Sequence, residues 1–132
     1  MAIGIELVRP AGLTGTAPYA YAAVTDPGRM AFTAGACPLD ADGNTVAVGD
    51  VAGQARQVMA NLVTALEGAG AGLGDVLKTT VYVVATENPA LVAAWEQVQA
   101  SPLAPAASTL LGVASLGYTG QLVEIEAIAA LE

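Results

Sequence analysis

Near the end of the chain, two runs of apolar residues are separated by a short loop that contains glycine. The runs cover residues 105–113 and 122–129. Apolar runs bounded by turn residues predict two strands. The second run also carries Glu124 and Glu126, and because side chains alternate along a strand, both carboxylates are expected on one face. Two negative charges within an otherwise apolar strand make this run the first candidate for a functional site.

The first quarter of the chain has short apolar stretches interrupted by proline and glycine. Residues 3–8, 19–24 and 29–34 are predicted to be strands on this pattern. The Asp-Pro-Gly sequence at 26–28 is typical of a turn and predicts that the second and third strands form a hairpin.

A helix is predicted over residues 51–68, with Asp50 as its N-cap. Apolar residues recur there at steps of three and four, which predicts one buried stripe: Val51, Ala55, Val58, Leu62 and Leu66. The polar residues of this segment are expected mostly on the other faces: Gln54, Arg56, Gln57, Asn61 and Glu67.

The most regular alternation lies at residues 76–84, where Lys78, Thr80 and Tyr82 are expected on one face of a strand and the apolar residues on the other. A second helix is predicted to follow, with Asn88 as N-cap and proline as the first helical residue. Its buried stripe would contain Leu91, Trp95 and Val98.

The elements therefore follow the order β-β-β-α-β-α-β-β in one domain, residues 1–132. Each helix lies between strands, so both can cover one face of a single sheet as crossover connections in an α+β fold. The opposite face would carry the polar residues named above together with Leu122 and Ile128. A mixed apolar and charged face of this kind predicts association between copies of the chain.

Charge and composition exclude several function classes. The net charge is −8, with four cationic residues, so nucleic-acid binding is disfavoured. Histidine is absent, which removes the commonest general base and metal ligand, and we expect neither a metal nor a cofactor. No apolar run reaches the roughly 20 residues of a membrane span, and no signal peptide is visible. The single cysteine, Cys37, is expected to be an unreactive buried thiol in a reducing compartment, the cytoplasm.

Five stretches, in this order, together resemble the RidA/YjgF family of imine and enamine deaminases: APY at 17–19, FTAGACP at 32–38, QARQVMANL at 54–62, GDVLKTTVYV at 74–83 and EIEAIA at 124–129. The resemblance covers nearly the whole chain. It implies a chorismate-mutase-like fold and a homotrimer that packs its sheets inward, with clefts for a small-molecule ligand between subunits. It also implies cofactor-independent hydrolysis of reactive imines to ketones and ammonia.

The same resemblance assigns roles to individual residues. It implies that Glu124 positions the attacking water and that Tyr19 lines the pocket. It places Gly35 along the cleft and the backbone amide of Thr109 against the ligand. Glu126 is interpreted as a structural residue.

Ala107 occupies the position at which the family carries an arginine that clamps the substrate carboxylate. A charge-assisted hydrogen bond contributes roughly 1.5–3 kcal/mol, so efficient hydrolysis of 2-aminoacrylate or 2-iminopropanoate is not expected. Arg9 and Lys78 are candidate substitutes, but the sequence places neither in the cleft. Two hypotheses stay open: a hydrolase of an imine that lacks this carboxylate, and a non-catalytic trimer that binds a small molecule or a partner protein.

Overall fold

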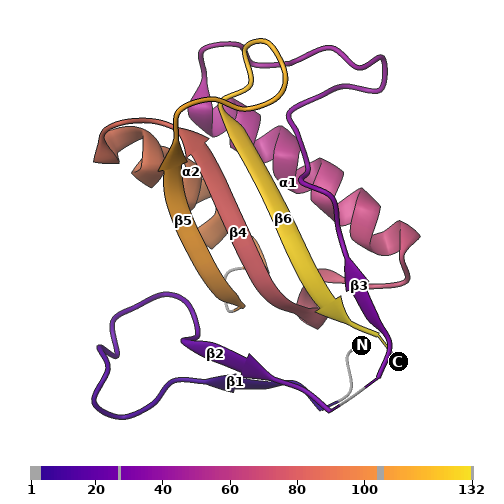
Figure 1. Cartoon of the computed structure of the whole chain (residues 1–132), viewed down its shortest axis with the longest axis vertical. Helices are drawn as coiled ribbons and strands as arrows, with labels where there is room; N and C mark the ends of the chain where they lie inside the picture. Colours follow the sequence, from indigo (N-terminus) through magenta and orange to yellow (C-terminus); the bar gives the residue numbers. More distant parts are fainter. Residues whose placement is uncertain (1–3, 27, 104–105, 132) are drawn as a thin grey trace.

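The computed structural model describes residues 4–26, 28–103 and 106–131, and its helices and strands follow the predicted order (Figure 1). The α+β fold class is confirmed. The elements are β1 (Glu6–Val8), β2 (Ala22–Val24), β3 (Met30–Phe32), α1 (Val51–Gly68), a 3-10 turn (Leu73–Asp75), β4 (Val76–Val84), α2 (Asn88–Gln99), β5 (Ala107–Val113) and β6 (Val123–Ala130). The first three strands are shorter than the sequence pattern predicts.

The described strands form two sheets, so the prediction of a single sheet is wrong. Four strands pair in the order β3-β6-β4-β5, with β4 parallel to β5 and antiparallel to β6. Among the described residues, β1 and β2 pair only with each other. They form a two-stranded ribbon beyond the end of the larger sheet (Figure 1). The two terminal runs are therefore not neighbours in the sheet, because β4 lies between them.

The predicted hairpin of the second and third strands is also wrong. β2 pairs with β1, whereas β3 pairs with β6 through Met30 opposite Ala130 and Phe32 opposite Ile128. Residue 27 of the predicted turn lies outside the described residues. A local turn pattern does not say which strand supplies the backbone hydrogen bonds, and the long apolar β6 provides a distant partner for β3.

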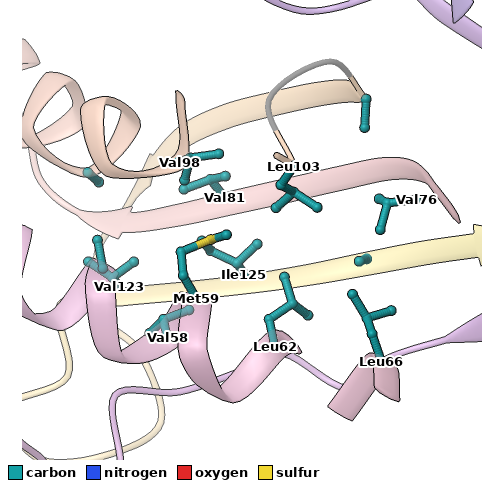
Figure 2. Close-up of a cluster of buried hydrophobic side chains, with 14 of the residues drawn as sticks. Val58, Met59, Leu62, Leu66, Val76, Val81, Val98, Leu103, Val123 and Ile125 are labelled. Carbon is teal, nitrogen blue, oxygen red and sulfur yellow. The ribbon is translucent and has the colours of Figure 1, made fainter. Parts of the chain in front are cut away.

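Both helices cover the same face of the four-stranded sheet, as the alternation predicts (Figure 1). Figure 2 shows the apolar side chains of α1 pointing at β6 and β4. Val58, Leu62 and Leu66 of α1 and Val98 of α2 are almost fully buried, and so are their strand partners Val81, Val123 and Ile125. Removing these side chains from water is the main stabilising contribution to the layer.

The helix starts agree only in part with the sequence. Asp50 caps α1 by accepting a hydrogen bond from the backbone nitrogen of Gly53 at 3.0 Å. In α2 the N-cap is Glu87, without a side-chain cap bond, so the prediction that Asn88 is the cap is wrong. Because the extended backbone of Glu87 already ends the preceding segment, Asn88 becomes the first helical residue.

Gln54 is the main exception to the predicted pattern of α1, because its polar side chain is fully buried. Its Nε2 donates to the backbone oxygen of Gly120 at 2.8 Å, and its Oε1 accepts from the backbone nitrogen of Leu122 at 2.7 Å. Both bonds go to the segment that leads into β6. The amide therefore satisfies two backbone groups of this segment, whose Leu122 oxygen also accepts a hydrogen bond from Val84 of β4.

Replacing Gln54 by leucine should destabilise the protein, because two backbone groups would lose their partner. An orphaned buried polar group costs about 1–3 kcal/mol, so we expect the free energy of unfolding to fall by about 2–4 kcal/mol in chemical denaturation. Gln57→Leu is the matched control, since Gln57 bonds only the side chain of Asn61. An equal fall in the free energy of unfolding of the two variants would contradict the role of Gln54 in holding these backbone groups.

Candidate functional site

The face of the sheet that the helices leave open carries the polar residues predicted for it. On β4, Thr80 lies opposite Glu126 and Tyr82 lies opposite Glu124 in the antiparallel register with β6. These four side chains are partly exposed, whereas the residues between them on both strands are buried. The prediction that these carboxylates share a face with Tyr82 is confirmed.

Glu124 is the carboxylate that the surrounding segments hold in place. The Nε2 of Gln121 donates to its Oε1 at 3.0 Å, and the Sγ of Cys37 lies 3.3 Å from the same oxygen. The other oxygen, Oε2, lies over Gly35, where an added Cβ would be only 2.0 Å away. Residue 35 is therefore glycine because the Glu124 carboxylate occupies the space of a side chain.

The segment that contains Gly35 and Cys37 is fixed by β6 and by α1. The backbone of Ala36 exchanges hydrogen bonds with Ile125 of β6 at 2.7 and 3.2 Å. The Nδ2 of Asn61 on α1 donates to the backbone oxygens of Cys37 and Leu39 at 2.8 and 2.9 Å. Figure 1 shows this segment and the loop before β6 meeting at one end of the sheet, where Thr45 Oγ1 also donates to the backbone of Thr119.

Cys37 has an unusual electrostatic environment for a thiol. Burial, followed by the hydrogen bond to Glu124 and its negative charge, raises the pKa of Cys37 to about 11. The thiol is therefore protonated at neutral pH and can act as a hydrogen-bond donor. The raised pKa agrees with the unreactive thiol predicted from the sequence, but the prediction that it is buried is wrong, because Cys37 is only partly buried. The sequence gave no sign of its contact with Glu124.

Tyr82 lies between the two carboxylates of β6. Burial raises the pKa of its hydroxyl, and the negative charges of Glu126 and Glu124 raise it further. The structural role predicted for Glu126 stays a prediction. Glu126 and Thr80 also line a hollow of about 130 Å³ on the open face, together with Phe32 and Lys78.

A larger and more open groove of about 540 Å³ adjoins the Glu124 site. Gly35 and Cys37 line it on one side, and Gln57, Asn61 and Tyr118 line it on others. Glu124 itself does not line this groove, but Gly35 and Cys37, which contact its carboxylate, do. The groove has room for a small molecule. Within the described residues, no group of three His, Cys, Asp or Glu side chains is arranged to hold a metal ion.

The remaining predicted site residues lie in two other places. Ala107 is paired in register with Lys78, and the Nζ of Lys78 donates to the side chain of Thr109. Burial lowers the pKa of Lys78. Lys78 and Tyr82 are four residues apart on β4, about 13 Å at strand spacing, so this group is separate from Glu124 within one chain.

Tyr19 occupies the third place, on the connection between β1 and β2. Its ring makes edge contacts with Tyr21 and with Trp95 of α2, at centroid distances of 5.7 and 6.3 Å. Arg9 donates to the backbone oxygens of Tyr19 and Ala17, so its guanidinium holds its own loop. Sequence reasoning missed Gln121, whose only signal was a polar residue three positions before Glu124.

Comparison with known proteins gives consistent matches. The family model described as endoribonuclease L-PSP matches residues 12–131. A 2-iminobutanoate/2-iminopropanoate deaminase of Salmonella typhimurium is 43% identical over 63 residues, 48% of each chain. The chain likewise spans about half the length of two archaeal relatives from the RutC family.

Solved structures match over nearly the full length. The crystal structure of YyfB of Yersinia pestis, from the conserved Rid protein family, has a TM-score of 0.86 and 32% identity, covering 98% of this chain and 100% of that one. Escherichia coli TdcF with bound serine has a TM-score of 0.65 and 30% identity, covering 98% of both chains. No helix in the described part of the chain is long and apolar enough to cross a membrane.

Gly35→Ala should displace the Glu124 carboxylate, because the new methyl group and Oε2 cannot occupy the same space. Inserting a methyl group into a packed site costs about 1–3 kcal/mol, which chemical denaturation would measure. Gly117→Ala is the control, since a Cβ there would meet nothing within 4 Å among the described residues. A Gly35→Ala variant as stable as the control would show that Glu124 does not occupy this position.

Proposed function

Because this chain belongs to the RidA/YjgF family, we propose that it hydrolyses a small imine or enamine without a cofactor, with Glu124 holding the attacking water. The observation that carries the proposal is the position of Glu124. Two donors hold one of its oxygens and the other lies over Gly35, beside a groove with room for a small molecule. The deaminase name of the Salmonella relative supports the same reaction class.

The reaction balances with water as the only co-reactant. Glu124 accepts a proton as the water oxygen adds to the imine carbon, and the proton passes to the nitrogen. In the resulting carbinolamine, Glu124 takes the hydroxyl proton and passes it to the amino nitrogen as the carbon–nitrogen bond breaks and the carbonyl forms. The products are a carbonyl compound and ammonia, and the carboxylate is regenerated.

We propose that the substrate lacks the carboxylate that 2-iminopropanoate carries. Ala107 has no group that can bind an anion, and Glu124 would repel one. Arg9 is occupied by loop carbonyls, and Lys78 donates to Thr109 and lies about 13 Å along β4 from the strand position of Glu124 of the same chain.

A homotrimer would complete the cleft. The open face exposes 70% of Phe32 and 43% of Met30, together with partly exposed charged residues, a composition suited to contact with another copy. We propose that such contact brings Thr109 and residue 107 of one subunit toward Glu124 and Gly35 of another. This accounts for the separation of these groups within a single chain.

Glu124→Gln should lower kcat roughly 10²- to 10⁴-fold, the usual contribution of a general base. The substrate would be the imine that an amine oxidase forms from a primary amine, with ammonia release followed over the uncatalysed rate. Glu67→Gln, an exposed change on α1, is the control. Unchanged turnover in Glu124→Gln would exclude the mechanism, and binding of the imine without turnover by the native protein would favour a non-catalytic binding protein.

Ala107→Arg should raise kcat/KM for 2-iminopropanoate by about ten- to a hundredfold, because it supplies the missing charge-assisted bond to the carboxylate. Ala107→Gln is the matched control, with a long polar side chain but no charge. Equal effects of the two changes, or none, would count against a carboxylate site at residue 107.

A further inference from the structure

Hydrogen bonds to both its oxygen and its nitrogen fix the orientation of the Gln121 side-chain amide. The residue is 4% exposed, and its Oε1 accepts a hydrogen bond from the backbone nitrogen of Tyr118 at 3.1 Å. Because the oxygen faces that N–H group, the amide nitrogen must face the other way. The nitrogen donates to the backbone oxygen of Val123 at 3.1 Å and to Oε1 of Glu124 at 3.0 Å.

Cys37 provides a second donor to the same carboxylate, from the segment that follows β3. Its Sγ lies 3.3 Å from Oε1 of Glu124 and 3.5 Å from the backbone oxygen of Gly35, so the nearer acceptor carries the negative charge. Asn61 fixes the backbone of Cys37 from α1. The two donors therefore come from segments that are 84 residues apart in sequence and are held independently.

Both donors bond the same oxygen of Glu124, so the two carboxylate oxygens lie in different environments. We propose that Gln121 and Cys37 are positioning residues that hold Oε1 of Glu124, so that Oε2 is the oxygen that binds and deprotonates the water. This inference rests on the proposed function of Glu124. Gly35, which also lines the groove, leaves the space that Oε2 needs.

The first test measures the position of Glu124 without any enzyme assay. Cys37 is the only cysteine, so its alkylation by iodoacetamide as a function of pH reports the pKa of its thiol. The ionisable groups near it are Glu124 on β6, Asp40 and Tyr118 on the groove, and Tyr82 across from Glu124. Its neighbours on α1, Gln57 and Asn61, are uncharged. Glu124→Gln removes the adjacent charge and should raise alkylation at pH 8 roughly tenfold, one unit of pKa.

Gln121→Met keeps the side-chain length but removes the N–H donor. Whether Cys37 alkylation then becomes faster or slower shows whether Gln121 holds Glu124 in place. Gln121 lies close enough to Cys37 to lower the pKa of the thiol, so losing its amide without any movement of Glu124 would slow alkylation. If Gln121 holds Glu124 beside Cys37, the carboxylate moves away, and alkylation should instead become faster, toward the Glu124→Gln rate. Slower or unchanged alkylation would overturn the positioning role.

The second test separates positioning from simple destabilisation. With the amine-oxidase imine as substrate, Gln121→Met should lower kcat about ten- to a hundredfold with KM changed less than twofold. Cys37→Ala should lower kcat as well, and Cys37→Ser, which restores a donor, should lose less. Gln99→Leu, an exposed change at the end of α2, is the control. Equal losses in the alanine and serine variants would exclude a donor role for Cys37.

The two tests distinguish failure of the proposed function from failure of the positioning inference. If the native protein hydrolyses no imine, the proposed function fails while the alkylation profile still decides whether Gln121 holds Glu124. If hydrolysis depends on Glu124 but neither the alkylation rate nor kcat responds to Gln121→Met, the positioning inference alone is wrong.

Discussion

Two side-chain amides on one helix hold the end of the sheet at which Glu124 lies. Gln54 satisfies the backbone of Gly120 and Leu122, and Asn61 satisfies the backbone of Cys37 and Leu39. Buried backbone groups are costly without partners, so these bonds define where both loops can lie. The apolar stripe of α1 packs on the sheet, and its amides at the same time position the loops. The helix that builds the core therefore also builds the candidate site.

The position of Glu124 follows from this arrangement. Once the two loops are fixed, Gln121 and Cys37 both donate to its Oε1, and the carboxylate projects over residue 35. Only glycine leaves room there. Within the described residues, a charged group on a face without helices is thus held by neutral donors. Such an arrangement keeps the carboxylate available to a ligand, whereas a salt bridge would occupy it.

Much of this could be predicted from the sequence, because side-chain alternation is a local property. The alternation placed Tyr82 and Glu124 on one face, and the three- and four-residue steps located the stripe of α1. Strand pairing is not local, so the predicted hairpin failed where β3 pairs with β6 instead. Gln54 departs from the polar face because its partners lie 66 and 68 residues away. The contacts of Gln121 and Cys37 with Glu124 were not predicted for the same reason, since neither pattern nor spacing reveals contact between two loops.

The distribution of charge gives the most specific constraint on a ligand. Two of the four cationic side chains are engaged away from Glu124: Arg9 holds carbonyls of its own loop, and Lys78 donates to Thr109. The other two, Arg29 and Arg56, are exposed and line neither the groove beside Glu124 nor the hollow on the open face. Within the described part of one chain, the groove is therefore lined by amides, a thiol, a phenol and the carboxylate of Asp40. Since like charges repel most strongly where water is partly excluded, a neutral or cationic imine fits this environment better than an anionic one. The alanine at position 107 and the charges around Glu124 thus both support the proposal of an imine without a carboxylate.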